Sequence, residues 1–376
     1  MRKSFKFRLY PTKSQVKSLK NTLEVCRHIY NRTLGFRKDA WENEKKSISL
    51  YDTNKLLKVW SIEFPQNKTV YSQVLQNVQV RVDLAYQAFF RRVKAGEEPG
   101  YPRFKGKGRY DSFTYPQSGF KTLTDNRVYL SKIGKVKINF HRELIGKIKN
   151  LIITKSATDK WYVCFSCEVD SNPLPELKLS IGIDVGLTSF ATLSNGEKVD
   201  NPRFFRKGEK IIAKAQRKLS KQDKDTPERI KARKVVAHVY EKVSNQRKDF
   251  AHKLSRKWVN QFGIIIFEKL DIQSMLKNHY LAKSISDAAW NQLIQYTSYK
   301  AVDAGRKCIL VNPRNTSKKC SRCGTLVEKD LSARIHSCPV CGLEIDRDLN
   351  AAINILALGL QCLDENPRNS RIYSGE

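Results

Sequence analysis

The sequence contains no uninterrupted apolar run of about 18 residues, the length that a membrane-spanning helix requires. Its first residues also lack the signal-peptide pattern of a short basic segment followed by an apolar core. We therefore expect no membrane partner and a cytoplasmic location. Hydrophobic residues still make up 40% of the 376 residues, so the composition predicts a folded chain of two or three domains.

Acidic residues are scarce relative to basic ones. The sequence has 37 Asp and Glu against 70 Lys and Arg, which gives a formal net charge of +33. So large a surplus favours a polyanionic partner, and the lack of a membrane segment makes nucleic acid the better candidate. The nine cysteines, without a secretory signal, indicate a reducing compartment, where Cys-x-x-Cys pairs bind metal more often than they form disulfides.

The N-terminal part predicts strands on either side of a helical segment. "MRKSFKFRLYP" alternates basic and apolar residues, which is typical of a strand, and Pro11 ends it. Thr12 and Gln15 then have the spacing of a helix capping box, and apolar residues follow at helical spacing up to Gly96. We predict a small β-barrel formed by residues 1–11 and 96–172, with a helical bundle of residues 12–95 inserted into it.

The C-terminal part predicts a different kind of domain. Residues 171–178 contain two prolines and predict a linker, after which "SIGID" and "GIIIFE" are typical of buried strands. Residues 203–257 predict a long helical segment or a helical hairpin, with 19 Lys and Arg against 6 Asp and Glu. Its predicted apolar face consists of Val235, Val239, Val243, Phe250, Leu254 and Trp258. The predicted fold class is therefore multidomain, an α+β part followed by an α/β part.

Four cysteines have the spacing of a zinc site. Cys320 and Cys323 form one Cys-x-x-Cys pair, Cys338 and Cys341 form another, and a glycine follows each pair. Two such turns place four thiolates around one Zn²⁺, and four protein ligands close its coordination shell. The zinc is therefore predicted to be structural. A third pair, Cys164 and Cys167, lies in a strand-like segment, where residues three apart point to opposite faces and serve packing.

Four carboxylates occur at the ends of predicted elements. Asp184 ends one apolar strand, Glu268 ends another, and Asp346 and Asp348 precede the helical segment "LNAAINILALGL". Each has an ordinary explanation alone, such as capping a helix. Together, acids at neighbouring strand ends can converge, and converging carboxylates need cations to neutralise them. We predict one or two Mg²⁺ ions, which would support phosphodiester hydrolysis.

The order of these motifs resembles a known family. Asp184 in "GIDVG", Glu268 in "FEKL" and Asp348 in "DRDLNAA" resemble the acids of a RuvC-type nuclease, which has the RNase H fold. "FRLYPTKSQ", "GYPRFKGK", "NQRKDFAHKLS" and "NPRNTSKKCSRCG" are similar to segments of TnpB, a transposon-encoded relative of compact type V CRISPR effectors. The resemblance covers nearly the whole chain, from Phe7 to about Leu356.

This resemblance implies an RNA-guided DNA endonuclease of an insertion sequence. Its partners would be a guide RNA transcribed from the transposon end and a double-stranded DNA target beside a short motif. The barrel would be a wedge-like domain and the helical bundle a recognition lobe. Residues 178–312 and 345–362 would form the RuvC-like domain, residues 313–344 a zinc ribbon that binds target nucleic acid, and residues 363–376 a frayed tail.

The resemblance also assigns roles to the acids. Asp184, Glu268 and Asp348 would be catalytic ligands of Mg²⁺, while Asp346 would support them by orienting a metal-bound water or by capping the turn. Bound to DNA, the protein would associate with a prokaryotic nucleoid. The basic loop of residues 102–109, with Arg103 and Lys105, would hold nucleic-acid backbone. Gln73 and Gln76, on the second long predicted helix, have the chemistry to pair with adenine.

Two other functions fit parts of the sequence. One is a zinc-ribbon protein or repressor that binds nucleic acid without cutting it, which the intact set of acids disfavours. The other is a DNA transposase with an RNase H fold. A transposase of the single-strand His-x-His type is disfavoured, because the six histidines include no such pair.

Overall fold

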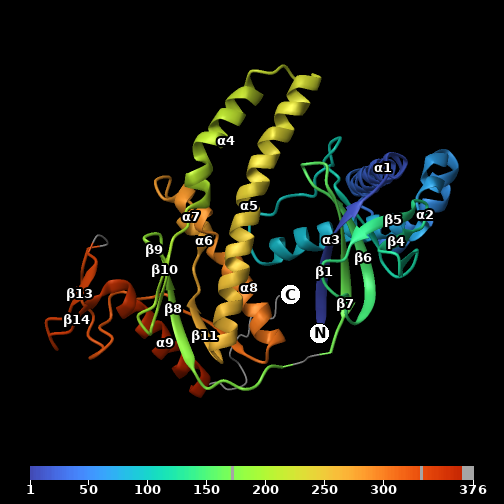
Figure 1. Ribbon diagram of the computed structural model, residues 1–376. Helices are drawn as coiled ribbons and strands as arrows, with labels where there is room; N and C mark the ends of the chain where they lie inside the picture. The colour runs from blue at the N-terminus through green and yellow to red at the C-terminus, as the bar shows by residue number, and fades with distance from the viewer. Residues whose placement is uncertain (171–172, 331–332, 366–376) are drawn as a thin grey trace. The chain divides into compact units, whose positions relative to one another are not determined.

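The computed structural model describes residues 1–170, 173–330 and 333–365 (Figure 1). The chain divides into two compact units, Met1–Asp170 and Ser171–Glu376. Within the described ranges, none of the helices is both long enough and apolar enough to span a bilayer.

A seven-stranded antiparallel sheet forms the centre of the first unit. Its strand order is β2-β6-β7-β1-β5-β4-β3, so β1, which begins the chain, lies in the middle. Ring centroids of Tyr115 and Phe120, on the two outermost strands, lie 6.4 Å apart, so the sheet nearly closes into a barrel. The strands are β1 (Arg2–Tyr10), β2 (Ser112–Tyr115), β3 (Phe120–Leu123), β4 (Arg127–Leu130), β5 (Gly134–Asn139), β6 (Lys147–Lys155) and β7 (Trp161–Glu168).

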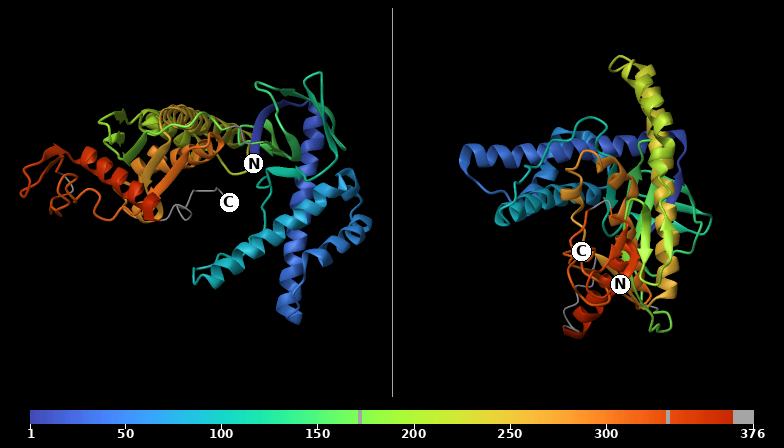
Figure 2. Two further views of the ribbon diagram at one scale, coloured as in Figure 1. Left: turned by 90° about the horizontal axis from the view of Figure 1, so that it is seen from below. Right: turned by 90° about the vertical axis from the view of Figure 1, so that its left-hand side faces the viewer.

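Helices separate β1 from the rest of the barrel along the chain. They are α1 (Lys13–Glu44), α2 (Leu50–Glu63), the short 3-10 helix η1 (Pro65–Thr69) and α3 (Ser72–Lys94). The predicted capping box is confirmed, because Thr12 and Gln15 exchange side-chain and backbone hydrogen bonds at the start of α1. The helices α1 and α3 lie against each other (Figure 2), and their buried faces join the barrel interior in one hydrophobic core.

The second unit contains a five-stranded mixed sheet of order β10-β9-β8-β11-β12. Its parallel strands are β8 (Ser180–Val185), β11 (Ile264–Glu268) and β12 (Lys307–Val311). Two antiparallel strands, β9 (Ser189–Leu193) and β10 (Lys198–Asp200), complete it on the β8 side.

Helices cover both faces of this sheet, and successive side chains of β11 are buried against opposite faces. Ile265 and Phe267 pack with helices α5 (Pro227–Gln261) and α8 (Trp290–Asp303), whereas Ile266 packs with α9 (Arg347–Glu365). The helix α9 crosses β8 at Gly182, where a side-chain carbon would collide with the Ala352 carbonyl oxygen. A glycine in "SIGID" is therefore what lets α9 lie directly on the strand.

Two long helices form a hairpin that extends away from the sheet (Figure 1). They are α4 (Phe204–Ser220) and α5, which lie side by side. Val243, Leu254 and Trp258 of the predicted apolar face are buried, but Val235 is 52% exposed, because the far end of α5 has only α4 to pack against. At the other end, Asp287 accepts hydrogen bonds from the Phe205 amide nitrogen and from Arg247.

The remaining elements of the second unit are short. They are α6 (Ile272–Met275), α7 (Ala282–Ala288), β13 (Ile335–Ser337) and β14 (Glu344–Asp346). The helix α9 continues to Glu365 and so includes residues 363–365 of the predicted tail, whereas residues 366–376 of that tail lie outside the described ranges.

Candidate active site and metal centre

Asp184 and Glu268 occupy matching places on neighbouring parallel strands. In the register of β8 and β11, Ile183 lies opposite Phe267, so Asp184 and Glu268 each follow a paired residue. Alternation along the strands turns both acids to the face that α9 covers, because Gly182 and Ile266, two residues earlier, contact that helix. Parallel pairing therefore brings together two acids that are 84 positions apart in the sequence.

Asp348 reaches the same place from α9. It is the second residue of the helix, one turn before Ala352, and Ala352 contacts β8 at Gly182. The packing of α9 on β8 thus directs the beginning of the helix toward the strand end that carries Asp184. The Asp348 side chain is 17% exposed, which leaves it open to only a little solvent.

The electrostatics of Asp184 show that these acids interact. Burial raises the pKa of Asp184 well above its ordinary value, and the negative charges of Glu268, Asp348 and Asp346 raise it further. The guanidinium of Arg347 acts in the opposite direction. A proton or a cation is thus favoured on Asp184.

Glu268 is the most buried of these acids, with 8% of its surface exposed. Burial raises its pKa, and a hydrogen bond donated by the Thr316 hydroxyl to Glu268 Oε1 opposes that rise. Thr316 lies in the loop that follows β12 and is itself buried.

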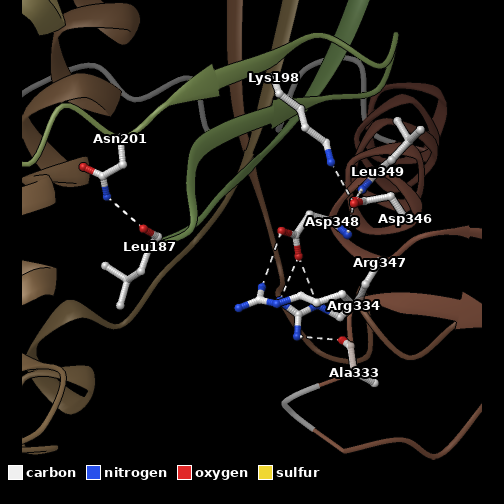
Figure 3. A network of polar contacts seen from close by, with 9 residues as sticks. All are labelled: Leu187, Lys198, Asn201, Ala333, Arg334, Asp346, Arg347, Asp348 and Leu349. Carbon is white, nitrogen blue, oxygen red and sulfur yellow. Dashed lines mark hydrogen bonds and ion pairs between the residues drawn. The ribbon is translucent and has the colours of Figure 1, made fainter.

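Asp346 has a different set of contacts. Its Oδ1 accepts hydrogen bonds from the backbone amides of Asp348 and Leu349, each at 3.0 Å, and its Oδ2 pairs with Lys198 Nζ at 2.7 Å (Figure 3). Burial alone would raise the pKa of Asp346, but the hydrogen bond from Lys198 and those from the two amides lower it below the ordinary value. Oδ1 therefore caps α9, and Oδ2 binds Lys198.

Asp348 is held by arginines. Its Oδ1 accepts hydrogen bonds from Arg347 Nε at 3.0 Å and Arg347 Nη2 at 2.9 Å, and its Oδ2 lies 4.0 Å from Arg334 Nη1 (Figure 3). Within the described ranges, the acids do not form a group of three or more whose ligand atoms all lie within 4.8 Å of one another, whereas the four predicted zinc cysteines do.

The four cysteines form two matching turns. In each turn the first cysteine accepts a backbone hydrogen bond from the glycine four residues later, at 3.0 Å, and both glycines, Gly324 and Gly342, have positive φ. The Sγ atoms of Cys320 and Cys341 are 3.6 Å apart, as are those of Cys323 and Cys338. A hydrogen bond with the Thr325 side chain lowers the pKa of Cys323 to about 6, which favours the thiolate that zinc binds.

Two asparagines of α9 connect the cysteine centre to the acids. The Asn350 side chain donates to the Lys319 carbonyl and accepts from the Ser321 amide, beside Cys320. One turn later, Asn354 Nδ2 donates to the Thr316 carbonyl at 2.8 Å. The segment of residues 316–321 thus carries the partner of Glu268 at one end and the first zinc cysteine at the other.

The predicted nucleic-acid contacts lie in the first unit. Gln73 is half-buried and accepts a hydrogen bond from Ser118, so its amide already has a protein partner, whereas Gln76 is exposed. Arg103 is exposed, and Lys105 is fixed by its backbone, which exchanges two hydrogen bonds with the Asn31 side chain. The third Cys-x-x-Cys pair lies on β7 as predicted, with Cys167 buried and Cys164 half-buried on the other face.

The prediction missed several residues around the acids. Thr316, Lys198 and Arg347 contact Glu268, Asp346 and Asp348 respectively, but no local pattern marks Thr316 or Lys198. Arg347 offered one signal, because a basic residue in the first turn of a helix is unfavourable and therefore calls for a partner.

Together, the nearly closed barrel, the mixed sheet with acids at its parallel strand ends and the four-thiol cluster define a multidomain protein of mixed α and β structure. Three family models match different parts of the chain. Residues 163–279 match the family described as "Probable transposase", and residues 290–355 match the "Cas12f1-like, TNB domain". Residues 1–46 match a "Helix-turn-helix domain", although that segment here forms β1 and the single long helix α1.

The chain belongs to the TnpB family. It is 34% identical over 368 residues to a "Putative RNA-guided DNA endonuclease" of Streptomyces pristinaespiralis, covering 96% of this chain and 90% of that protein. It is 30% identical to the "Putative RNA-guided DNA endonuclease InsQ" of Escherichia coli K12, covering 95% and 92%. The solved structure of "the mini-RNA-guided endonuclease CRISPR-Cas_phi3" is 11% identical, with a TM-score of 0.49 and coverage of 95% and 92%.

Proposed function

We propose that this protein is the RNA-guided DNA endonuclease of an insertion sequence, which cuts target DNA beside a short motif by metal-dependent phosphodiester hydrolysis. The observation that carries the proposal is the convergence of Asp184, Glu268 and Asp348 on one face of the sheet. The names of the two relatives with 30% identity or more agree with it.

The acids fit a hard divalent cation. They supply only carboxylate oxygens, the ligands that Mg²⁺ prefers. Burial and the neighbouring carboxylates disfavour the charge of Asp184, and burial disfavours that of Glu268, so a bound cation would offset both effects. Asp184, Glu268 and Asp348 would hold one or two Mg²⁺ ions, which when bound supply Lewis-acid activation of the phosphodiester and of the attacking water. Asp346 keeps the first turn of α9 in place, and Thr316 orients Glu268.

The cysteines fit a structural zinc. Four thiolates would close the coordination shell, and the asparagine contacts of α9 would transmit the fixed geometry of the ribbon, residues 313–344, to Thr316. A rigid ribbon is then a support for the acids as well as a surface for target nucleic acid.

The basic segments would bind the nucleic acid. In this proposal the barrel is the wedge-like domain, the helices α1 to α3 are the recognition lobe, and the mixed sheet with α9 is the RuvC-like nuclease domain of RNase H fold. The surplus of Lys and Arg on α4 and α5, and the loop that contains Arg103 and Lys105, would hold the backbone of a guide RNA from the transposon end and of its duplex with target DNA.

The test has two parts. The RNA that co-purifies with the protein is sequenced, and the complex is then incubated with a plasmid that carries a matching target and Mg²⁺. We expect one defined RNA with a variable 3′ end, and plasmid linearisation that Asp184→Ala reduces by about 10³-fold, as loss of several kcal/mol of transition-state stabilisation implies. Asp200→Ala, an exposed acid on β10 of the same sheet, is the matched control and should cut normally.

Other outcomes would favour the other functions. A complex that binds the plasmid but leaves it intact in Mg²⁺ would favour a non-cleaving nucleic-acid-binding protein or repressor. Cutting or strand transfer without any bound RNA would favour a DNA transposase with an RNase H fold. Cutting by Asp184→Ala at the wild-type rate would contradict the assigned site.

A further inference from the structure

Arg347 lies between the two aspartates of the "DRD" sequence and binds one of them. Its Nε and Nη2 both donate to Asp348 Oδ1, and its Nη1 donates to the Ala333 carbonyl at 3.2 Å (Figure 3). The backbone amide of Arg347 donates to the Arg334 carbonyl at 2.8 Å. With 20% of its side chain exposed, the guanidinium is held on several sides.

The helix dipole alone makes the position of Arg347 unfavourable for a positively charged side chain. Arg347 is the first residue of α9, where the helix dipole is positive and disfavours a basic side chain. Nearby carboxylates must therefore offset the unfavourable effect of the dipole on the Arg347 charge, and Asp348 and Asp184 do so. Arg347 donates to Asp348 directly, and its charge also opposes the rise in the pKa of Asp184. The guanidinium therefore acts as a counter-charge to two of the three proposed metal ligands.

The same contact competes with a metal ion. Both nitrogen donors point at one oxygen of Asp348, and the other oxygen faces Arg334 at 4.0 Å. A carboxylate with one oxygen bound by two arginine nitrogens, and with a second guanidinium near the other oxygen, attracts a divalent cation less strongly. Together with the spread of the acids, this arrangement describes a site that is neutralised from within.

We propose that Arg347 is the internal counter-cation of the acidic site, which holds Asp348 while no divalent cation is bound and must release it before the ion binds. This inference rests on the proposed function of the three acids. Arg347 then positions Asp348 rather than taking part in the reaction. It stabilises the metal-free protein, and it weakens the affinity of the site for the ion that replaces it.

The test is the affinity of the full-length, zinc-loaded protein for Mn²⁺, measured from the electron paramagnetic resonance signal of the free ion at about pH 8, where protons compete little with carboxylates. The variants are Arg347→Gln, which keeps an amide donor for the Ala333 carbonyl, and Asp184→Ala. Arg233→Gln, an exposed residue on α5, controls for the general loss of a positive charge.

We expect Arg347→Gln to bind Mn²⁺ more tightly by on the order of tenfold, because one unit of nearby positive charge is removed. Arg233→Gln should bind like the wild type. Zinc content and thermal unfolding establish that each variant is folded. If Arg347→Gln loses zinc, Arg347→Lys replaces it. Lysine keeps the positive charge but cannot reproduce the two-nitrogen contact, so that variant should bind Mn²⁺ more tightly than the wild type, by less than about tenfold.

The two ways of failing are distinct. If Asp184→Ala abolishes Mn²⁺ binding while Arg347→Gln leaves the affinity unchanged or weaker, the ion and Arg347 are compatible and the counter-cation role is wrong. If Asp184→Ala binds Mn²⁺ as tightly as the wild type, the proposed acidic metal site itself is wrong.

Discussion

The two candidate metal centres of the second unit are assembled in different ways. The four cysteines come from 22 consecutive residues, and their ligand atoms all lie within 4.8 Å of one another. The acids come from β8, β11 and the start of α9, and in the described part of the chain no three of them lie as close together as the thiols do. The thiols are gathered by two local turns, whereas the carboxylates depend on strand pairing and on the packing of a helix.

The difference follows from the charge each centre carries without metal. Thiols as a group carry less negative charge than carboxylates near neutral pH, so the cysteine turns can lie close together in nearly their final geometry. Carboxylates repel one another, and in the acidic centre Arg347 binds Asp348 while Lys198 binds Asp346. Metal binding should therefore complete the cysteine centre and rearrange the acidic one.

The largest expected effect is at the cysteine centre. Cys323→Ser should abolish zinc binding, because it removes one of the four ligands of the site. The effect should be large, because structural Zn²⁺ sites contribute on the order of 10 kcal/mol to folding. The zinc content of the purified protein and protease sensitivity within residues 313–344 are the measurements. Cys362→Ser, an exposed cysteine near the end of α9, should retain zinc. A Cys323→Ser protein with full zinc content would show that the cluster is not a metal site.

The next effect separates the two aspartates of α9. Asp348→Asn should reduce DNA cleavage by about 10³-fold, because it weakens a proposed metal ligand. Asp346→Asn should reduce cleavage by less than about tenfold, because asparagine can still cap α9 and only the exposed ion pair with Lys198, worth up to about 1 kcal/mol, is lost. The measurement is the DNA cleavage rate of each variant at the same Mg²⁺ concentration. A greater loss for Asp346→Asn would reverse the assignment.

A smaller effect concerns the stability of the protein without Mg²⁺. The pKa of Asp184 is raised in the folded protein, so the wild type loses stability as the pH rises from about 4, the ordinary value, through the raised value. Asp184→Asn cannot ionise, so in Mg²⁺-free buffer at about pH 8 it should melt at a higher temperature than the wild type.

That difference should shrink as the pH falls toward 4, because the wild-type carboxyl is then protonated too. Added Mg²⁺ should stabilise the wild type and leave Asp184→Asn nearly unchanged. Asp200→Asn, on exposed β10, is the control and should show neither effect. Equal melting temperatures of Asp184→Asn and the wild type across this pH range would show that Asp184 is not strained by its neighbours.

The smallest effect is at Thr316. Thr316→Val removes the hydroxyl that holds down the pKa of Glu268, so that pKa should rise further. Because protonated glutamate is a poor ligand for Mg²⁺, the acid limb of the pH profile of cleavage should move to higher pH. Thr297→Val, where a buried threonine donates only to a carbonyl within α8, should leave the profile in place. A profile of Thr316→Val that matches the wild type would rule out this role.

Sequence reasoning reached the elements more readily than the contacts between them. The alternation in "MRKSFKFRLYP" and the spacing of Thr12 and Gln15 predicted β1 and the start of α1 correctly, since each depends on neighbours within a few residues. The exposure of Val235 was missed, because a helical stripe predicts which side is apolar but not how far along the helix a partner extends.

The sequence alone determined the local chemistry: a basic chain, two cysteine turns and acids placed at the ends of apolar strands. These features depend on composition and on spacings of a few residues. Only the tertiary structure decided which acids meet and what neutralises them. The register of β8 with β11, and the contact of α9 with Gly182, bring Asp184, Glu268 and Asp348 to one face. The physical reason is that charge interactions depend on distance in space, and pairing between remote strands sets that distance.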